Sequence, residues 1–376
     1  MCPALLVLGV QGTSESSPAA DPFVDAGMLG HLFGPMLAEG ESVARAYVPY
    51  PASFGGAPLT GTGTEPFASS VASAQANLAA MASQAVAQCP ATQVGLAGFS
   101  GGALVVEGFA EQVGAGLGPI PAERVAGVAL LSNPARAAGG DPIPGRPGQF
   151  SPDQAPGTDG TATAQIHLTP VPASGGIAAD GTDYGALTGR VAEFCAAGDL
   201  SCDAPGHAAA LRTAAGLAAQ ADLRDPGAAA SSLGAAWQSS VAEASASVLL
   251  EDVTIVNGQV NYVPEQSVSQ RLAAAADPRT PARGPDQAAA VGDKIAQITT
   301  AVTADPLTQI PRLIGQVAAA VGANIADNGD LLNPTVLAHY ANVVGAHVGY
   351  ASTGEAERAG DWFAALSRDL TGGGQR

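Results

Sequence analysis

Basic residues are scarce in this 376-residue chain: 15 lysines and arginines stand against 33 aspartates and glutamates, a formal net charge of -18. Proteins that bind nucleic acid or anionic membrane surfaces neutralise phosphates with lysine and arginine, so this balance argues against both as electrostatic partners. Aromatic residues are also few, at 5%, although hydrophobic residues reach 47%. Alanine and glycine dominate, which is typical of a globular protein with a tightly packed core of small side chains.

Long hydrophobic runs are missing from the sequence as well. No run approaches the roughly 20 apolar residues that span a bilayer. The short run at residues 5–8 predicts a strand, not the core of a signal peptide. The length suits either one large α/β domain with an insertion or two domains.

The sequence contains four cysteines, Cys2, Cys89, Cys195 and Cys202, which allow three pairings. A local disulfide would close the short loop between the last two, and adjacent parallel strands would bring the first two together. Free thiols or a metal site are the alternatives, but no Cys-x-x-Cys or His-x-x-x-His spacing accompanies the cysteines, which argues against zinc. Two disulfides would indicate an oxidising compartment and a mature form whose export segment has been removed. The sequence indicates no cofactor requirement.

The segment Gly98-Phe99-Ser100-Gly101-Gly102 matches the Gly-x-Ser-x-Gly nucleophile elbow. A short apolar run at 92–97 predicts a buried parallel strand before it, and residues 103–109 can open a helix after it. Small residues flank the serine because the sharp turn brings the strand and helix backbones close together. The turn would expose the serine hydroxyl at the sheet edge, with the helix N-terminus directed at it.

Short apolar runs alternate with helical patterns over the first half of the chain. This alternation predicts a three-layer α/β fold, a central and mostly parallel sheet with helices on both faces. The expected strands are residues 5–10, 46–50, 93–97, 125–131, 165–168 and 191–195. A final amphipathic helix at about 355–370 would bury Trp362 and Phe363.

The pattern changes beyond residue 207, where helical periodicity prevails and the only strand signal surrounds an Asn-Gly turn at 253–260. A capping side chain precedes proline at three expected helix starts, Asp225-Pro226, Asp305-Pro306 and Asn333-Pro334. We therefore expect an Ala-rich helical insertion at 208–336, acting as a cap or lid. The catalytic domain would consist of residues 1–207 and 337–376.

A serine hydroxyl needs a base, an orienting carboxylate and oxyanion donors to act as a nucleophile near neutral pH. In the α/β-hydrolase order the acid follows the serine and the histidine comes last. His347 occupies a Gly-bounded segment, expected to be a loop just before the final helix, and is the favoured base. His207 is the alternative. The remaining histidines, His31, His167 and His339, are interpreted as structural or surface residues.

Asp199 is the favoured acid because it lies in the loop between two cysteines, where a disulfide would fix the carboxylate. Asp203 is the nearest competitor. The backbone N–H groups of Gly101 and Thr13 are the expected oxyanion donors, and the threonine hydroxyl is a candidate third donor.

Together these segments resemble the cutinase family of α/β hydrolases, and within it the cutinase-like lipid esterases of mycolic-acid-containing actinobacteria. The matching segments are Cys2-Pro3, Gly12-Thr13-x-Glu15-Ser16-Ser17, Tyr47-Val48-Pro49-Tyr50, Cys89-Pro90, Gly98-Phe99-Ser100-Gly101-Gly102-Ala103, Cys195-x-x-Gly198-Asp199-x-x-Cys202 and His347-x-x-Tyr350. The resemblance implies an α/β-hydrolase fold with a triad of Ser100, Asp199 and His347. It also implies an oxyanion hole of Thr13 and Gly101, and disulfides Cys2–Cys89 and Cys195–Cys202.

Two features depart from the family pattern. Family members usually carry glutamine where Gly101 stands, so a side-chain support is lost although the backbone donor remains. The acid and the base are close in sequence in small family members, whereas here the helical insertion separates Asp199 from His347. The insertion would therefore emerge beside the active site and influence the choice of substrate.

The resemblance implies hydrolysis of long-chain acyl esters of the cell envelope through an acyl-enzyme, and mycolate esters such as trehalose mycolates are the favoured substrates. Phospholipase A or thioesterase activity is the nearest alternative. An inactive hydrolase fold that binds envelope lipid is the alternative from another class. The expected partners are a lipid ester or glycolipid, with peripheral contact to the envelope lipid layer and no nucleic acid. The expected location is secreted or associated with the envelope.

Overall fold

The computed structural model describes residues 2–58, 60–179 and 183–372. The chain forms two compact units, Met1–Ala204 with His339–Arg376, and Pro205–Ala338. The second unit contains the expected insertion, residues 208–336, whose role as a cap or lid remains a prediction.

The central sheet of the first unit has five parallel strands in the order β2-β1-β3-β4-β5. The strands are β1 (Leu5–Val10), β2 (Val43–Tyr47), β3 (Gln93–Phe99), β4 (Val125–Leu131) and β5 (Val191–Phe194). Leu96 of β3 pairs with Leu8 of β1 on one side and with Val128 of β4 on the other. The parallel sheet is confirmed, and β1 and β4 begin and end where the sequence predicts.

Residues 165–168 do not form the predicted strand. A 3-10 turn, η3 (Thr163–Gln165), precedes an irregular segment in which Leu168 is buried and His167 is exposed. The Leu168 N–H donates to the carbonyl of Phe150 at 2.8 Å, within the same irregular excursion. The prediction was wrong because one buried side chain in so short an alternation can anchor a loop as well as a strand.

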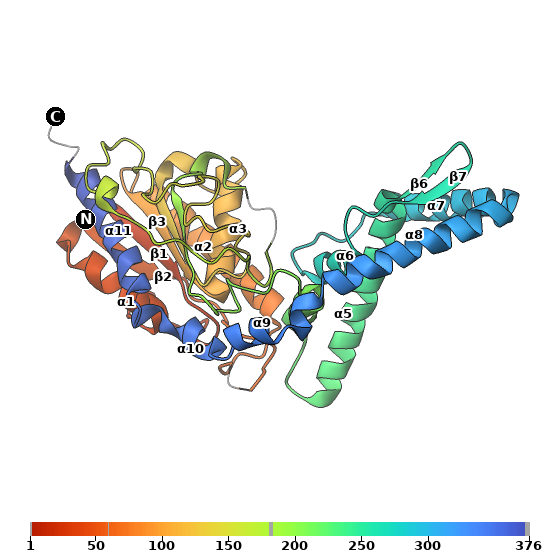
Figure 1. Cartoon of the computed structure of the whole chain (residues 1–376). Coiled ribbons are helices and arrows are strands. Elements are labelled where there is room, and N and C mark those ends of the chain that lie inside the picture. Colours follow the sequence, from red (N-terminus) through yellow and green to blue (C-terminus); the bar gives the residue numbers. More distant parts are fainter. Residues whose placement is uncertain (1, 59, 180–182, 373–376) are drawn as a thin grey trace. The chain divides into compact units, whose positions relative to one another are not determined.

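Helices cover both faces of the sheet (Figure 1). One face carries α1 (Gly27–Leu37) and α11 (Glu355–Gly372), and the other carries α2 (Phe67–Gln88) and α3 (Gly101–Gly114). Shorter elements of this unit are η1 (Gly40–Ser42), η2 (Ala122–Arg124), η4 (Gly185–Leu187), α10 (Val343–Val348) and η7 (Gly349–Ala351). The three-layer α/β-hydrolase fold is therefore confirmed.

Glycines within the strands make room for aromatic side chains of α11. A Cβ on Gly95 would lie 2.9 Å from the Phe363 ring, and one on Gly127 would lie 2.8 Å from the Trp362 ring. Both rings are fully buried, as predicted. The chain thus packs its few large aromatics where neighbouring strands carry no side chain.

The second unit consists of helices and one hairpin. Its elements are α4 (Ala209–Ala219), α5 (Pro226–Ser247), the π-helical turn η5 (Val248–Asp252), β6 (Val253–Val256), β7 (Gln259–Tyr262), α6 (Val268–Ala276), α7 (Pro285–Ala304), α8 (Pro306–Ala326) and η6 (Gly329–Leu332). The helix α9 (Pro334–His339) follows and ends at the boundary with the first unit. The hairpin and the three capped helix starts are confirmed. None of the described helices is both long and apolar enough to cross a membrane.

Candidate active site

Ser100 lies at the sharp turn between β3 and α3. Its backbone has φ 54° and ψ -122°, a conformation that L-residues rarely adopt and that is often found at functional sites. A Cβ on Gly98 would lie 2.6 Å from the backbone of Ala103, and one on Gly102 would lie 2.0 Å from the carbonyl oxygen of Val10. Only glycine fits at these two positions, so the local sequence allows the strand–turn–helix geometry of a nucleophile elbow.

Thr13 and Gly101, the two expected oxyanion donors, lie next to each other. A Cβ on Gly101 would lie 3.2 Å from Thr13 Oγ1 and 2.8 Å from the Phe67 ring. Phe67 therefore fills the space that a side chain at position 101 would need. A side chain at position 101 would therefore require the Phe67 ring to move.

The loop that carries Thr13 is held by a carboxylate. The Glu15 side chain accepts hydrogen bonds from the backbone N–H groups of Gly12 and Met28, each at 3.0 Å. Burial raises the pKa of this carboxyl, and the two backbone hydrogen bonds oppose that shift. Glu15 appeared in the sequence only as part of a matching segment, and its anchoring role was not predicted.

His347 lies in the last turn of α10, so the expected loop is instead a short helix. The predicted loop was wrong because glycines at 345 and 349 do not interrupt the helix before its end. His347 Nδ1 lies 2.9 Å from Asp199 Oδ1. The imidazole ring lies 5.3 Å, between ring centroids, from the ring of Phe99, which directly precedes Ser100.

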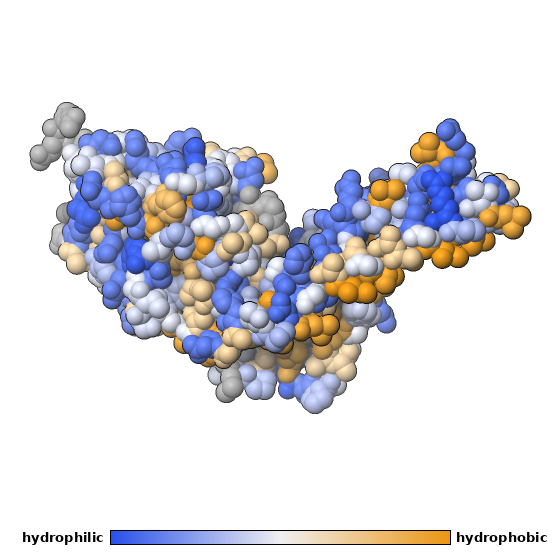
Figure 2. Space-filling model, in the orientation of Figure 1, coloured by the Kyte–Doolittle hydropathy of each residue, from blue (hydrophilic) through white to orange (hydrophobic). Residues whose placement is uncertain are grey.

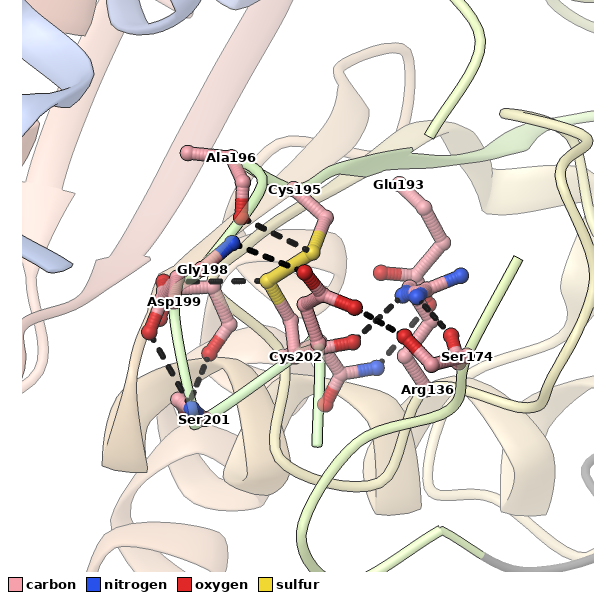
Figure 3. Close-up of a disulfide and its surroundings, with 12 residues drawn as sticks. Arg136, Ser174, Glu193, Cys195, Ala196, Gly198, Asp199, Ser201 and Cys202 are labelled. Carbon is pink, nitrogen blue, oxygen red and sulfur yellow. Dashed lines mark hydrogen bonds between the residues drawn. A yellow bond between two sulfur atoms is a disulfide. The ribbon is translucent and has the colours of Figure 1, made fainter. Parts of the chain in front are cut away.

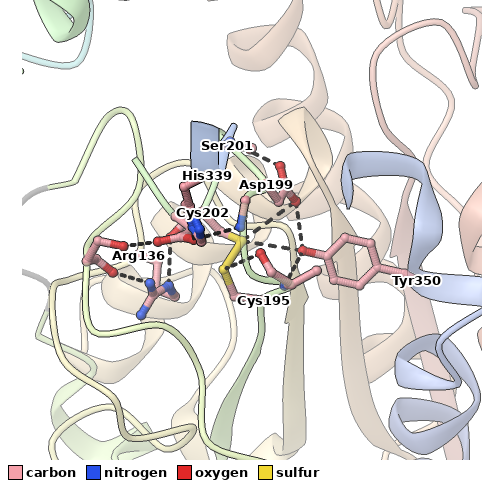
Figure 4. A network of polar contacts seen from close by, with 11 residues as sticks. Arg136, Cys195, Asp199, Ser201, Cys202, His339 and Tyr350 are labelled. Carbon is pink, nitrogen blue, oxygen red and sulfur yellow. Dashed lines mark hydrogen bonds and ion pairs between the residues drawn. A yellow bond between two sulfur atoms is a disulfide. The ribbon is translucent and has the colours of Figure 1, made fainter. Parts of the chain in front are cut away.

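The Asp199 carboxylate is fully buried in the loop that the Cys195–Cys202 disulfide closes (Figure 4). The Tyr350 hydroxyl donates to Asp199 Oδ2 at 2.7 Å, and the Ser201 N–H donates to Oδ1 at 3.1 Å. Burial alone would raise the pKa of this carboxyl, but hydrogen bonds from surrounding side chains, His347 first among them, hold its pKa below the usual value. An ionised carboxylate beside an imidazole is the arrangement that orients a catalytic base.

Two residues of this arrangement were not predicted to belong to the site. Ser132 follows β4, with its Oγ 3.0 Å from His347 Nδ1 and its backbone at φ 55°. Tyr350 is fully buried, and burial raises the pKa of its phenol. Ser132 follows the carboxyl end of a parallel strand, where sites of α/β folds gather, and that was the one signal available.

The Asp203 carboxylate, the competing acid, binds other side chains than the Asp199 carboxylate does; Figure 3 labels its partners Gly198 and Ser174, and Figure 4 labels His339. Its Oδ2 lies 2.8 Å from His339 Nε2 and accepts a 2.7 Å hydrogen bond from the Gly198 N–H, while its Oδ1 accepts from the Ser174 hydroxyl. The hydroxyl and the imidazole both bind the carboxylate and not each other. The imidazole is therefore not placed to deprotonate that serine, and the network instead fixes the bend before Asp199.

The other candidate histidines lie at the surface. His31 is exposed on α1, and His167 Nδ1 lies 2.9 Å from the Ser151 hydroxyl on an exposed loop. The His207 side chain is 66% exposed and lies 3.9 Å from Asp327. Within the described ranges, no group of three or more His, Cys, Asp or Glu side chains is arranged to hold a metal ion.

The structure thus brings His347 to Asp199 and Thr13 to Gly101, and places Ser100 directly after an aromatic residue that contacts the histidine ring. Among the described residues, Ser100 Oγ and His347 share no hydrogen bond. Such bonds are often long before substrate binds. Both expected disulfides are present: Cys2–Cys89 joins the chain ahead of β1 to the chain ahead of β3, and Cys195–Cys202 encloses Asp199.

Known proteins share this fold and parts of this sequence. A family model described as Cutinase matches residues 1–215. A Corynebacterium glutamicum protein named Carboxylesterase Culp6 homolog is 37% identical over 128 residues, which cover 31% of this chain and 37% of that protein. The match therefore spans little more than a third of the relative's length.

Solved structures give weaker likenesses. The catalytic core domain of an acetyl xylan esterase from Trichoderma reesei is 17% identical, with a TM-score of 0.39, and the match covers 62% of this chain and 99% of that one. Lysin B from Mycobacteriophage D29 is 20% identical, with a TM-score of 0.29, over 52% of this chain and 64% of that one. The family model, in contrast, covers more than half of the chain, and the chain belongs to the cutinase family of serine esterases.

Proposed function

We propose that this protein is a serine carboxylic ester hydrolase that uses Ser100 as nucleophile, His347 as base and Asp199 as orienting acid. The observation that carries this proposal is the buried Asp199 carboxylate, 2.9 Å from the imidazole of His347. Ser100 stands in a strained elbow directly after Phe99, whose ring lies 5.3 Å, between centroids, from the His347 imidazole. Cutinase-family membership supports the same chemistry.

In the proposed reaction, His347 donates its Nδ1–H to Asp199, which leaves Nε2 free to accept the proton of the Ser100 hydroxyl. The serine oxygen attacks the ester carbonyl carbon, and the resulting oxyanion accepts hydrogen bonds from the N–H groups of Gly101 and Thr13. His347 then gives its proton to the departing alcohol, leaving an acyl-serine. Water then gives a proton to the same imidazole and attacks the acyl carbonyl carbon. The imidazolium returns this proton to the departing serine oxygen, which releases the acid and restores the serine hydroxyl.

The proposed substrates are long-chain acyl esters of the cell envelope, with mycolate esters such as trehalose mycolates first among them. A helical unit rich in alanine and aliphatic side chains supports this choice, because each buried methylene contributes about 0.8 kcal/mol and long chains therefore gain most from apolar surface. The resemblance to lipid esterases of mycolic-acid-containing actinobacteria supports it as well.

The proposed location is outside the cytoplasm, secreted or associated with the envelope. Two disulfides support it, because such bonds form and persist in oxidising compartments. One of them encloses Asp199, so a reducing environment would loosen the loop that holds the acid.

A fluorophosphonate probe tests the proposal, because it labels a serine only when a working base and oxyanion hole activate it. We expect labelling of Ser100 in the full chain and none in Ser100→Ala, with Ser231→Ala, an exposed serine of α5, as the matched control. Mass spectrometry of envelope lipid extracts before and after treatment would then identify the ester. Absence of labelling in the folded wild-type protein would overturn the enzymatic proposal and favour a lipid-binding protein.

A further inference from the structure

The helix α8 carries a stripe of large aliphatic side chains that no described residue of its own unit buries. Their exposed fractions run from 47% to 89%. At 100° per residue they fall within one narrow sector of the helix surface, about 27 Å long. We name this set the α8 stripe: Leu307, Ile310, Ile314, Val317, Val321 and Ile325. Figure 2 shows hydrophobic residues along α8.

The α8 stripe is not needed to hold the helix in its unit. A different side of α8 packs on the β6–β7 hairpin, where the side-chain oxygens of Gln309 and Gln316 accept hydrogen bonds from the Val260 and Tyr262 N–H groups at 3.1 and 3.0 Å. Leu313, on that same side, packs against the small core of the hairpin. The helix is therefore held in its unit by this other side, and the described residues of the unit leave the stripe exposed.

The stripe is also free of charge. Arg312 is the one charged residue of α8, and its guanidinium donates to Gln259 Oε1 at 2.7 Å and to the Asn261 side chain, on the hairpin side. Any surface that covers the stripe must therefore be apolar and gains nothing from carrying charge. Burial of a charged partner group against it would cost free energy without compensation.

The charge of the whole chain narrows the choice of partner. At a net charge of -18, a second copy of the chain or an anionic phospholipid surface would be repelled, whereas an uncharged layer would not. The stripe contains only Leu, Ile and Val, without the Trp, Tyr and Arg that dominate protein–protein hot spots. An amphipathic helix that lies on a lipid layer buries its apolar sector in this way.

We propose that the α8 stripe docks the protein onto an uncharged acyl-chain surface, such as the aggregated lipid esters on which it acts. This inference rests on the proposed function for the identity of the lipid, but it makes a claim about binding that is independent of catalysis. Docking would concentrate the protein at the lipid surface, whereas a dissolved short-chain ester would react without it.

The test is flotation of the full-length protein with triolein emulsion droplets and, separately, with anionic phosphatidylglycerol vesicles. We compare wild type with the double variant Ile314→Glu/Val321→Glu, and with Ala319→Glu as matched control. Ala319 is exposed on α8 but lies about 140° around the axis from Ile314. We expect droplet binding to fall at least about tenfold in the double variant only, weak binding of all three proteins to the anionic vesicles, and equal hydrolysis of p-nitrophenyl acetate.

Three outcomes would overturn the inference. Equal droplet binding by the double variant would show that the stripe is not the docking surface. A wild-type dimer in light scattering that becomes a monomer in the double variant would assign the stripe to a second copy. A loss of p-nitrophenyl acetate hydrolysis in the folded double variant would place the stripe against the catalytic unit. If wild type binds droplets but hydrolyses no ester, the docking surface stands and the proposed function fails.

Discussion

The two units of the chain bury their hydrophobic residues to very different extents. The α/β unit encloses two extensive clusters of buried side chains, one on each face of the sheet, that include its large aromatics. In the helical unit the one cluster found among the described residues has three buried members, Val253, Val260 and Ala301. Most of the exposed large hydrophobic side chains lie in this smaller unit. The first unit thus holds its side chains in a closely packed core, and the second leaves much of its apolar surface exposed.

This difference predicts that chemistry depends on the first unit alone. Replacing Ser100 with alanine removes the proposed nucleophile, and we expect kcat/KM for p-nitrophenyl butyrate to fall roughly 10⁴-fold. Circular dichroism should match wild type, because alanine is small enough for the elbow. The Ser231→Ala variant, altered in the helical unit, should keep full activity. Substantial turnover by Ser100→Ala would show that the active site lies elsewhere. It would then no longer follow that hydrolysis depends on the first unit alone.

In the helical unit, by contrast, the loss of one buried ion pair should destabilise the fold. Arg271 donates to the fully buried Asp252 at 2.7 Å, and also bonds to Glu251. Replacing Arg271 with alanine leaves a buried carboxylate without its partner, which costs about 3–5 kcal/mol. We expect the helical unit to lose hydrogen-exchange protection while hydrolysis of a soluble ester persists.

The control for this variant is Arg279→Ala, which breaks a partly exposed ion pair with the nearby Asp277 and should cost under about 1 kcal/mol. Equal loss of protection in β1 and β3 of the first unit would mean that the two units unfold together. That result would contradict the separation drawn from their cores.

The core of the α/β unit contains a carboxyl whose titration should change the free energy of unfolding with pH. Burial raises the pKa of Glu193 to about 7, although Asn133 donates to it at 2.9 Å. The folded state therefore favours the neutral carboxyl. The free energy of unfolding is highest, with respect to this group, below about pH 4.5, and it decreases as pH rises to about 7. Glutamine mimics the neutral form. We expect Glu193→Gln to be about 3 kcal/mol more stable than wild type at pH 8, with the difference vanishing below about pH 4.5.

Urea unfolding at pH 4.5, 6 and 8 measures this difference, with Glu123→Gln on the surface turn η2 as a control expected to show none. A constant difference across the three pH values would mean that Glu193 does not titrate on unfolding in this range. The prediction concerns the first unit only, so hydrogen exchange in α5–α8 should not change.

Local patterns were readable in the sequence, and contacts between distant segments were not. The elbow at Ser100 follows from the small residues beside it, and the Asp225 and Asp305 caps follow from their neighbouring prolines. The pairing of Asp203 with His339 joins segments on either side of the insertion, and no local pattern marks it. Ser132 likewise reaches His347 only because β4 ends beside the histidine in space. The catalytic roles of Ser100, Asp199 and His347 remain predictions until the variants are measured.

The smallest effect expected is at Tyr350, the buried phenol that supports the acid. Its hydroxyl donates to Asp199 and accepts from the Ala196 N–H at 3.0 Å, so phenylalanine leaves a carboxylate oxygen with one donor fewer. A hydrogen bond to a charged group contributes about 1.5–3 kcal/mol, and the lower end of this range corresponds to roughly tenfold in rate. Because other donors to the carboxylate remain, we expect Tyr350→Phe to lower kcat roughly tenfold with KM unchanged. Tyr262→Phe, on the hairpin of the helical unit, is the matched control and should leave kcat for a soluble ester at the wild-type value. If both variants behaved like wild type, the Tyr350 ring would serve only to pack beneath the loop. The Asp199 carboxylate would then be oriented by the disulfide, Ser132 and the Ser201 N–H.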